Sequence, residues 1–277
     1  MDERDGFIDI DAPDAPIYRI FPLWYFEETL CLRQLVLVPP HRWHDPFEFL
    51  ASQVMMEDEA YRQESLEPYL QHAFAQCWSR TEESDTLLRA YSRVSKDPYF
   101  HRNICPREEG VRVKTSPRKL LSALQKWATT TAMPGISCFV GAVQYTCREQ
   151  VQQTLTNRIY RHGPHAVGRG RLRAELLLLK RLAFSHEDEV RIICVASRDV
   201  PEESFPRIPI EPTELFDEVT FDPRLAPFER EERKAAAKSL GYNGPFNDSE
   251  LYHGTALIVK LPVRFPEWLK PRDGPSP

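Results

Sequence analysis

The sequence lacks the features that mark a secreted, zinc-binding or membrane protein. No two cysteines form a Cys-x-x-Cys pair, and the six cysteines do not combine with histidines at a spacing typical of zinc sites. No apolar run approaches the length of a membrane span. The acidic start carries no apolar segment behind a basic one, so we expect no signal peptide. These absences predict a reduced, cytoplasmic protein with no membrane contact.

An excess of positive charge is missing as well. The formal net charge is −5 and the pI is about 6.0, so the chain as a whole does not attract nucleic acid or anionic lipid. No Gly-x-Ser-x-Gly elbow surrounds Ser79, which argues against a serine hydrolase. What remains is a chain of 277 residues with 42% hydrophobic content, which is enough to bury a substantial core.

Strand-like stretches alternate with stretches of helical spacing, which predicts an α+β fold. We expect a single domain with a central, mostly antiparallel or mixed sheet flanked by helices. The expected strands cover residues 17–21, 32–38, 74–79, 110–115 (at an edge), 136–146, 218–221 and 255–261. The expected helices cover residues 23–30, 54–70, 82–94, 118–127, 149–160, 172–182 and 229–240. The domain is expected over residues 17–262, between a flexible acidic lead-in over 1–16 and a Pro-rich tail over 263–277.

The stretch from Lys180 to Ser197 has an unusual charge pattern. It predicts a strand that begins among carboxylates and then enters the core through residues 192–195. On a strand, the side chains of Glu187, Glu189 and Arg191 project from one face. Such a row at the mouth of a buried strand suggests a functional site. A cross-strand ladder of ion pairs explains the same row, and this alternative stays open.

Two other predicted strands carry polar groups. Tyr18 and Arg19 open the first strand, and a guanidinium binds a phosphate or carboxylate through two parallel hydrogen bonds. A lone arginine on a strand is, however, more often solvated or ion-paired. Ser79 follows Trp78 where another strand ends, so its hydroxyl can orient a ligand ribose or a carboxylate. A helix cap is an equally good explanation for this serine.

His44, Asp45 and Glu48 are potential metal ligands. Asp45 precedes Pro46 and a helical stretch, which is typical of a helix N-cap followed by proline at the first helical position. We therefore interpret this segment as a structural turn and predict no metal site.

The loop over residues 158–173 is basic. It holds five arginines, two histidines and three glycines, so it is a candidate surface for a nucleic-acid or protein target. A solvated flexible loop is the commoner explanation. Tyr160 is its only aromatic residue, which weakens the case for nucleic acid.

Several of these motifs, in this order, resemble a family of bacterial proteins known only as domain of unknown function twenty-nine seventy-one. The matching positions are Ile17-Tyr18-Arg19, Val38-Pro39-Pro40 with His44-Asp45-Pro46-Phe47-Glu48, Cys77-Trp78-Ser79, Leu88-x-x-Tyr91, and Lys180 before Glu187-x-Glu189-x-Arg191. The sequence departs from the family pattern at His44 (usually asparagine), at Leu88 (usually tryptophan) and in a longer segment 93–109 that lacks the usual His-x-Gly. These departures concern the wall of the expected pocket.

The layout is also similar to that of ADP-ribosyltransferases, which place an arginine on the first strand, a serine at a strand end and a late Glu-x-Glu. This resemblance implies a split sheet and NAD as the substrate. It implies that Arg19 holds the NAD pyrophosphate, with Tyr18 beside it, and that Trp78 or Tyr91 stacks on the nicotinamide.

The same resemblance implies the catalytic roles. Ser79 orients the nicotinamide ribose or the catalytic carboxylate. Glu189 accepts a hydrogen bond from a ribose hydroxyl and stabilises the oxocarbenium-like charge, and Glu187 activates the incoming nucleophile.

Two hypotheses therefore stand. The first is an NAD-dependent ADP-ribosyltransferase, a toxin or phage-defence effector that acts on nucleic acid or protein. The second is a non-catalytic binding or sensor domain that uses the same cleft for a nucleotide or a protein partner. A metal-dependent nuclease built on His44, Asp45 and Glu48 is less favoured. The first hypothesis requires Arg19, Ser79 and Glu189 to line one cleft.

Overall fold

The structure is a computed structural model. It describes residues 6–43, 55–57, 60–65, 72–133, 135–162, 170–196, 205–252 and 260. In this part of the chain, eight strands form one mixed sheet, in the order β1, β8, β11, β6, β2, β7, β13, β14. Their bounds are β1 Phe7–Ile8, β8 Ser137–Ala142, β11 Glu189–Val195, β6 Ala73–Ser79, β2 Ile17–Pro22, β7 Gly110–Thr115, β13 Glu218–Phe221 and β14 Phe246–Asn247.

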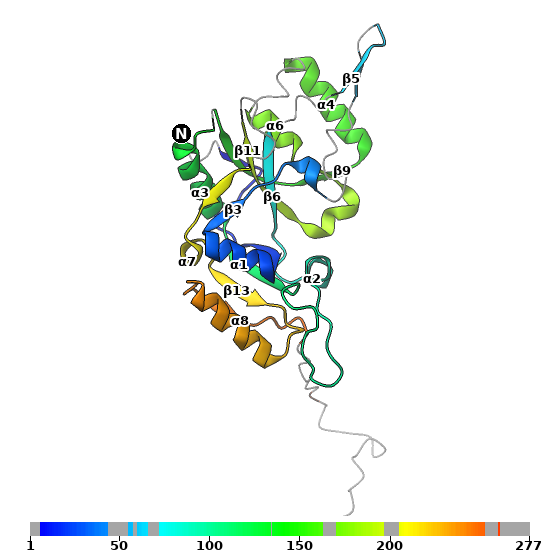
Figure 1. Cartoon of the computed structure of the whole chain (residues 1–277). Coiled ribbons are helices and arrows are strands. Elements are labelled where there is room, and N and C mark those ends of the chain that lie inside the picture. The colour runs from blue at the N-terminus through cyan, green and yellow to red at the C-terminus, as the bar shows by residue number, and fades with distance from the viewer. Residues whose placement is uncertain are drawn as a thin grey trace, which may run out of the picture.

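Helices flank this sheet, so the predicted α+β class is confirmed (Figure 1). Their bounds are α1 Leu23–Leu32, α2 Asp85–Tyr91, α3 Pro117–Thr130, α4 Arg148–His162, α6 Gly170–Leu176, α7 Pro212–Leu215 and α8 Pro227–Ser239, with short 3-10 turns η2 Pro40–Arg42 and η5 Leu182–Glu187. Three strand pairs lie outside the main sheet: β3 Gln34–Val36 with β12 Arg207–Pro209, β4 Met55–Glu57 with β5 Gln63–Ser65, and β9 Gln144–Thr146 with β10 Leu179–Arg181. None of the described helices is long and apolar enough to cross a membrane.

The sheet consists of two halves that meet at one residue pair. β6 and β2 are neighbours, but in the described chain they pair only at Ser79 and Tyr18. By contrast, β2 pairs with β7 through six residues and β11 with β6 through seven. Next to this junction the Arg19 side chain crosses between the strands, and its Nη1 donates a hydrogen bond to the Cys77 carbonyl. The sheet is therefore split between β6 and β2, as the layout resemblance implies.

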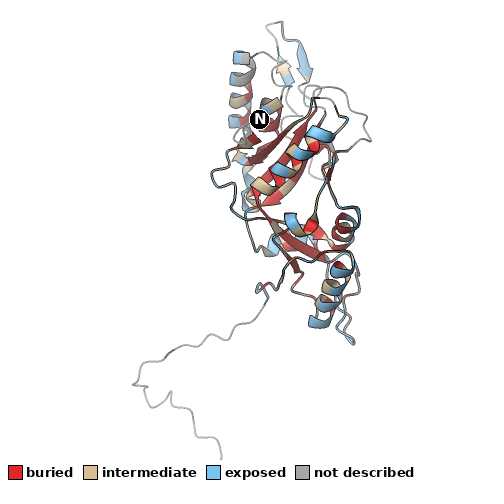
Figure 2. Cartoon of the chain, turned by 90° about the vertical axis from the view of Figure 1, so that its left-hand side faces the viewer, coloured by how far each residue is buried: buried red, intermediate tan, exposed pale blue. Residues whose placement is uncertain are grey.

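β11 is buried on both faces, which explains its uninterrupted apolar run. Alternate residues from Val190 to Cys194 join the core cluster that holds α3. Ile193 and Val195 face the other way and join a second cluster that holds α6. Figure 2 shows that the strands of the sheet are buried between helices whose outer faces are exposed. Glu189 begins this strand, so the core on both sides fixes the position of its backbone.

Helix boundaries follow the signals in the sequence. Ser116 caps α3, its hydroxyl accepting a hydrogen bond from the Lys119 amide at 3.4 Å, and Pro117 takes the first helical position. Ser84 caps α2 in the same way. Gly241 follows α8 with a φ of +94°, a conformation that glycine adopts without strain.

The helix predicted over residues 54–70 is wrong. The described residues of this stretch form β4 and β5, an antiparallel pair. Met55 and Met56 are adjacent instead of helically spaced, and Met55 is exposed. Without an apolar stripe to bury, helical propensity alone does not hold a helix here.

The helix predicted over residues 172–182 is also wrong in its second half. α6 ends at Leu176, and β10 pairs in parallel with β9. The run from Leu176 to Leu179 is buried throughout, and such a run is compatible with a buried strand as much as with a helix. Lys180 therefore lies on a strand.

Three further expectations need correction. β7 is not an edge strand, because it pairs with β2 on one side and β13 on the other. The strand predicted over 136–146 is divided into β8 and β9 at Val143. Part of the expected lead-in forms β1, which pairs with β8 and buries Ile8. The predicted tail over 263–277 lies outside the described residues, as does nearly all of the strand predicted over 255–261.

Candidate active site

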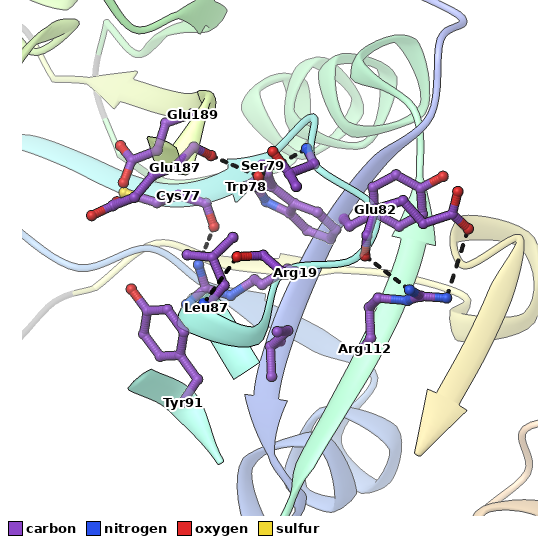
Figure 3. A pocket seen from close by; sticks show the side chains of 14 residues that line it. Arg19, Cys77, Trp78, Ser79, Glu82, Leu87, Tyr91, Arg112, Glu187 and Glu189 are labelled. Atoms are coloured by element: carbon purple, nitrogen blue, oxygen red, sulfur yellow. Dashed lines mark hydrogen bonds and ion pairs between the residues drawn. The ribbon is translucent and has the colours of Figure 1, made fainter. Parts of the chain in front are cut away.

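A pocket of about 510 Å³, its open mouth included, lies where the sheet splits. β2, β6, α2, β7 and the η5–β11 segment all contribute to its walls (Figure 3). The seven residues singled out in the sequence all line it: Tyr18, Arg19, Trp78, Ser79, Tyr91, Glu187 and Glu189. Segments more than 100 residues apart in the sequence (Ser79 and Glu187) meet here through a direct hydrogen bond.

Glu189 is held by charged groups on both of its oxygens. Its Oε1 accepts a hydrogen bond from Lys180 Nζ at 2.9 Å, and its Oε2 accepts one from Arg191 Nε at 2.9 Å. The backbone amide of Glu189 donates to the Tyr145 hydroxyl at 2.8 Å. Lys180 and Arg191 are both fully buried. The carboxylate therefore has a fixed orientation at the start of β11.

Glu187 does not lie on the strand, which corrects the predicted row. It ends the 3-10 turn η5, and Asp188 then adopts a left-handed conformation with a φ of +40°. Aspartate tolerates this region better than most residues. The Glu187 carboxylate still reaches the same cation as Glu189, because Lys180 Nζ donates to its Oε2 at 2.7 Å.

The alternative of a cross-strand ion-pair ladder is wrong. Across the sheet, Glu189 lies opposite Ser79, and Arg191 lies opposite Cys77 on one side and Gly141 on the other. None of these partners carries a formal charge. The ion pairs come instead from Lys180 on β10 and from within β11.

Ser79 fastens the turn that carries Glu187. Its hydroxyl donates to the Glu187 carbonyl at 2.6 Å and accepts a hydrogen bond from the Thr81 amide at 3.0 Å. Ser79 also pairs with Tyr18 and with Glu189 in the sheet. The serine thus connects both halves of the pocket to the glutamate segment.

The two glutamates have opposite pKa shifts. Burial raises the pKa of Glu187 to about 7, and its hydrogen bond with Glu189 adds to the effect, while Lys180 opposes it. Burial also acts to raise the pKa of Glu189. The charge of Arg191, the hydrogen bond with Glu187 and the charge of Lys180 outweigh it and lower that pKa to about 2. Near neutral pH, Glu189 is therefore ionised, whereas Glu187 is protonated in part of the molecules.

Arg19 lies in the middle of the pocket, between the glutamates and Arg112 (Figure 3). Its guanidinium carbon is 5.1 Å from the centre of the Phe21 ring. One terminal nitrogen donates to the Cys77 carbonyl, but the buried Nε–H finds no acceptor among the described residues. A hydrogen bond from this buried donor to a ligand oxygen would remove the cost of leaving the donor unsatisfied, and it would therefore stabilise the complex.

The two aromatic candidates, Trp78 and Tyr91, differ in how much of the side chain is exposed. Trp78 is only 2% exposed, and its indole nitrogen donates to Gln76 at 3.1 Å. Its ring packs edge-on against Phe21. Tyr91, on α2, is 48% exposed. Of the two, Tyr91 is the ring with surface available for stacking.

Arg112 and Glu82 form the other end of the pocket and were not expected from the sequence (Figure 3). Arg112 Nη1 donates to the Glu82 carbonyl at 2.8 Å, and its guanidinium lies 5.4 Å from the centre of the Tyr18 ring. The placement of residues 110–115 at a sheet edge concealed this role, because charged residues are common on edge strands. The signal was the single arginine between Val111 and Val113.

The other sequence candidates lie away from this pocket or outside the described residues. His44, Asp45 and Glu48 fall outside them, and the described residues contain no group of three potential metal ligands. Residues 163–169 of the basic loop are likewise outside, and its two described ends are not loop, because they belong to α4 and α6. Arg173, one of its arginines, is buried in α6 and donates to the Ala196 carbonyl at 3.3 Å, so it has a structural contact.

No family model matches the sequence, and no curated protein does either. Three solved structures of Thermus sp. 2.9 DarT show some similarity: the complex with ADP-ribosylated ssDNA (10% identity, TM-score 0.35, 86% of this chain), the complex with carba-NAD+ (11%, 0.33, 86%) and the complex with NAD+ (10%, 0.33, 85%), each over 96% of the DarT chain. TM-scores this low do not establish a shared fold, so this likeness carries no argument about function.

Proposed function

We propose that the chain is an NAD-dependent ADP-ribosyltransferase. The observation that carries the proposal is that Arg19, Ser79 and Glu189, three residues from separate segments, line one pocket at a split in the sheet. An ionised carboxylate and a second carboxyl group with a pKa of about 7 lie side by side there. This is the combination that glycosyl transfer through a cationic transition state needs.

In the proposed reaction, the bond between the ribose C1′ and the nicotinamide nitrogen breaks, and its electron pair leaves with neutral nicotinamide. Glu189 stabilises the positive charge that develops on the ribose. The acceptor nucleophile then bonds to C1′, and Glu187 takes the proton that the nucleophile loses. Ser79 fixes the turn that carries Glu187.

The remaining lining residues fit the binding of NAD. The Nε–H of Arg19 is available to a pyrophosphate oxygen, and the guanidinium supplies the charge. Tyr91 offers a half-exposed ring for the nicotinamide. Tyr18 and Arg112 form the far wall, where the ring and the cation already contact each other. Trp78 lines the pocket from β6 and packs against Phe21 in the core.

Glu189→Gln tests the catalytic role. Incubated with labelled NAD and either single-stranded DNA or cell-lysate protein, the wild-type chain should transfer label to an acceptor. We expect the variant to be slower by at least roughly 100-fold, the usual effect of removing one group that stabilises transition-state charge. The matched control is Glu231→Gln, since Glu231 is an exposed carboxylate on α8, far along the chain. An equally active Glu189→Gln variant contradicts the assignment.

The acceptor is proposed to be a nucleic acid or a protein, and the same assay separates the two. Label in the DNA fraction supports a nucleic-acid target, and label in the protein fraction supports a protein target. A toxin or defence role depends on which acceptor is modified.

A non-catalytic binding or sensor domain is the second candidate. The observation that favours it is that both glutamates already have cationic partners, as in a structural ion network. Under this hypothesis Glu189→Gln lowers the melting temperature, and the wild-type chain releases no nicotinamide. NAD binding without turnover supports this second function.

A further inference from the structure

Lys180 is a charged residue with no direct contact to the pocket. It lies on β10, its side chain is completely buried, and it is not among the residues that line the pocket. The Phe184 ring lies 4.8 Å from its ammonium. Burial of an ammonium group costs several kcal/mol unless carboxylates compensate it. In the sequence Lys180 directly follows four buried leucines, Leu176 to Leu179.

The compensation comes from the two pocket glutamates. Lys180 Nζ is 2.7 Å from Glu187 Oε2 and 2.9 Å from Glu189 Oε1. One cation thus bridges two carboxylates that belong to different backbone segments, a 3-10 turn and a strand. Without it, the turn and the strand have like charges side by side.

Other elements contribute the remaining groups around this pair. Arg191, on β11, bonds the second oxygen of Glu189. The other charged or titratable side chains that line the pocket are Tyr18 and Arg19 on β2, Cys77 on β6, Glu82 after β6, Tyr91 on α2 and Arg112 on β7. Tyr145 on β9 interacts with Glu189, and His186 and Asp188 flank Glu187 in the chain. Only Lys180 contacts both carboxylates among the ion pairs of the described chain.

We propose that Lys180 is a positioning residue of this site, which holds Glu187 and Glu189 together at the pocket and keeps both carboxyl groups able to ionise. The inference rests on the proposed transferase function. Arg191 adds to Lys180 at Glu189, which stays ionised beside the developing ribose charge. Among the described residues, Lys180 is the cation that bonds Glu187, and Glu187 remains the group that gains and loses a proton. Lys180 does not line the pocket, so it acts on the substrate through these carboxylates.

Lys180→Met tests this inference through pH dependence. Loss of a cation at this distance should raise the pKa of Glu187, so the midpoint of the pH–rate profile of NAD turnover should move upward by about one to three pH units. An NMR titration without NAD follows the carboxyl carbon of Glu187, whose signal is assigned by its absence in Glu187→Gln. The midpoint of this titration should move upward by the same number of pH units. The matched control is Lys234→Met, because Lys234 also lies near two carboxylates, Glu231 and Asp248, on the far side of the fold. Its profile and titration should match the wild type.

A purely structural lysine gives a different result. The rate then falls by the same factor at every pH, and the Glu187 titration stays in place, which overturns the inference. If Lys180→Met does not fold, Lys180→Gln replaces it, because its amide can still donate a hydrogen bond to the carboxylates but carries no charge. We expect the titration of Glu187 to move upward in this variant as well. An unmoved Glu187 titration in Lys180→Gln also overturns the inference.

The two proposals fail in distinguishable ways. No NAD turnover by the wild-type chain, with a titration that moves in Lys180→Met, overturns the transferase function and leaves the coupling of the three side chains intact. NAD turnover with an unmoved titration overturns the role of Lys180 alone.

Discussion

The chemistry of the pocket depends on how a few charges are shared. Glu189 is bonded by Lys180 and Arg191, whereas Arg19 has a buried Nε–H without an acceptor in the described chain. The Glu189 carboxylate thus has hydrogen-bond partners without a ligand, whereas the Arg19 Nε–H needs a ligand to supply its acceptor. We therefore expect ligand affinity to depend mainly on Arg19 and turnover mainly on the glutamates.

Arg19→Met should weaken NAD binding by roughly tenfold to a hundredfold. A hydrogen bond to a charged group contributes about 1.5–3 kcal/mol, and about 1.4 kcal/mol corresponds to tenfold in affinity. Isothermal titration calorimetry with NAD measures the change. Arg33→Met is the control, since Arg33 forms an exposed ion pair with Glu211. Equal affinities for the two variants contradict this role of Arg19.

The individual candidates could be found from the sequence because their residue types are unusual for strands. The contacts between these residues could not be found from the sequence. Lys180 was assigned to a helix end, since a buried leucine run does not distinguish helix from strand, and Arg112 was assigned to an edge. Both assignments depend on strand pairing, which a single sequence does not reveal.

The segment before β10 is packed closely against β8. A Cβ added to Gly141 would lie 2.3 Å from Leu178 Cδ1 and 3.2 Å from the Ile8 Cβ. Gly141 also pairs with Arg191, so the segment that leads into β10 and the strand β11 both lie against β8 at this residue. The packing of these elements therefore supports the site.

Gly141→Ala should lower the free energy of unfolding by about 1–3 kcal/mol, the usual cost of extra atoms in a packed core. Urea denaturation measures the loss. In a Leu178→Ala background the same substitution should cost less, because the atom that it would meet is gone. An equal cost in both backgrounds shows that the contact with Leu178 is not the cause.

The two halves of the sheet share a hydrophobic core although their strands meet at one pair. Phe21 and Val113 from one half and Trp78 and Val190 from the other belong to the same buried cluster. The Phe21 and Trp78 rings are 6.5 Å apart and nearly perpendicular. The split thus opens a pocket without separating the core, which fits the proposed single domain, although β1 at residues 7–8 extends the sheet ahead of the expected start at residue 17.

We expect the whole chain to unfold in one transition. Tryptophan fluorescence and far-UV circular dichroism should give coincident urea curves, since the cluster spans both halves. Two separate transitions contradict a shared core. Membership of β11 in this core was predictable from its apolar run, whereas the split was expected only from the layout resemblance, because strand pairing cannot be read from a single sequence.

The most direct test of the account is the rate of nicotinamide release from NAD by the wild-type chain and by Glu189→Gln. We predict release by the wild type, a rate at least roughly 100-fold lower for the variant, and retained NAD binding in both. Equal rates, or no release by a wild-type chain that binds NAD, contradict the claim that this pocket is the active site of an ADP-ribosyltransferase.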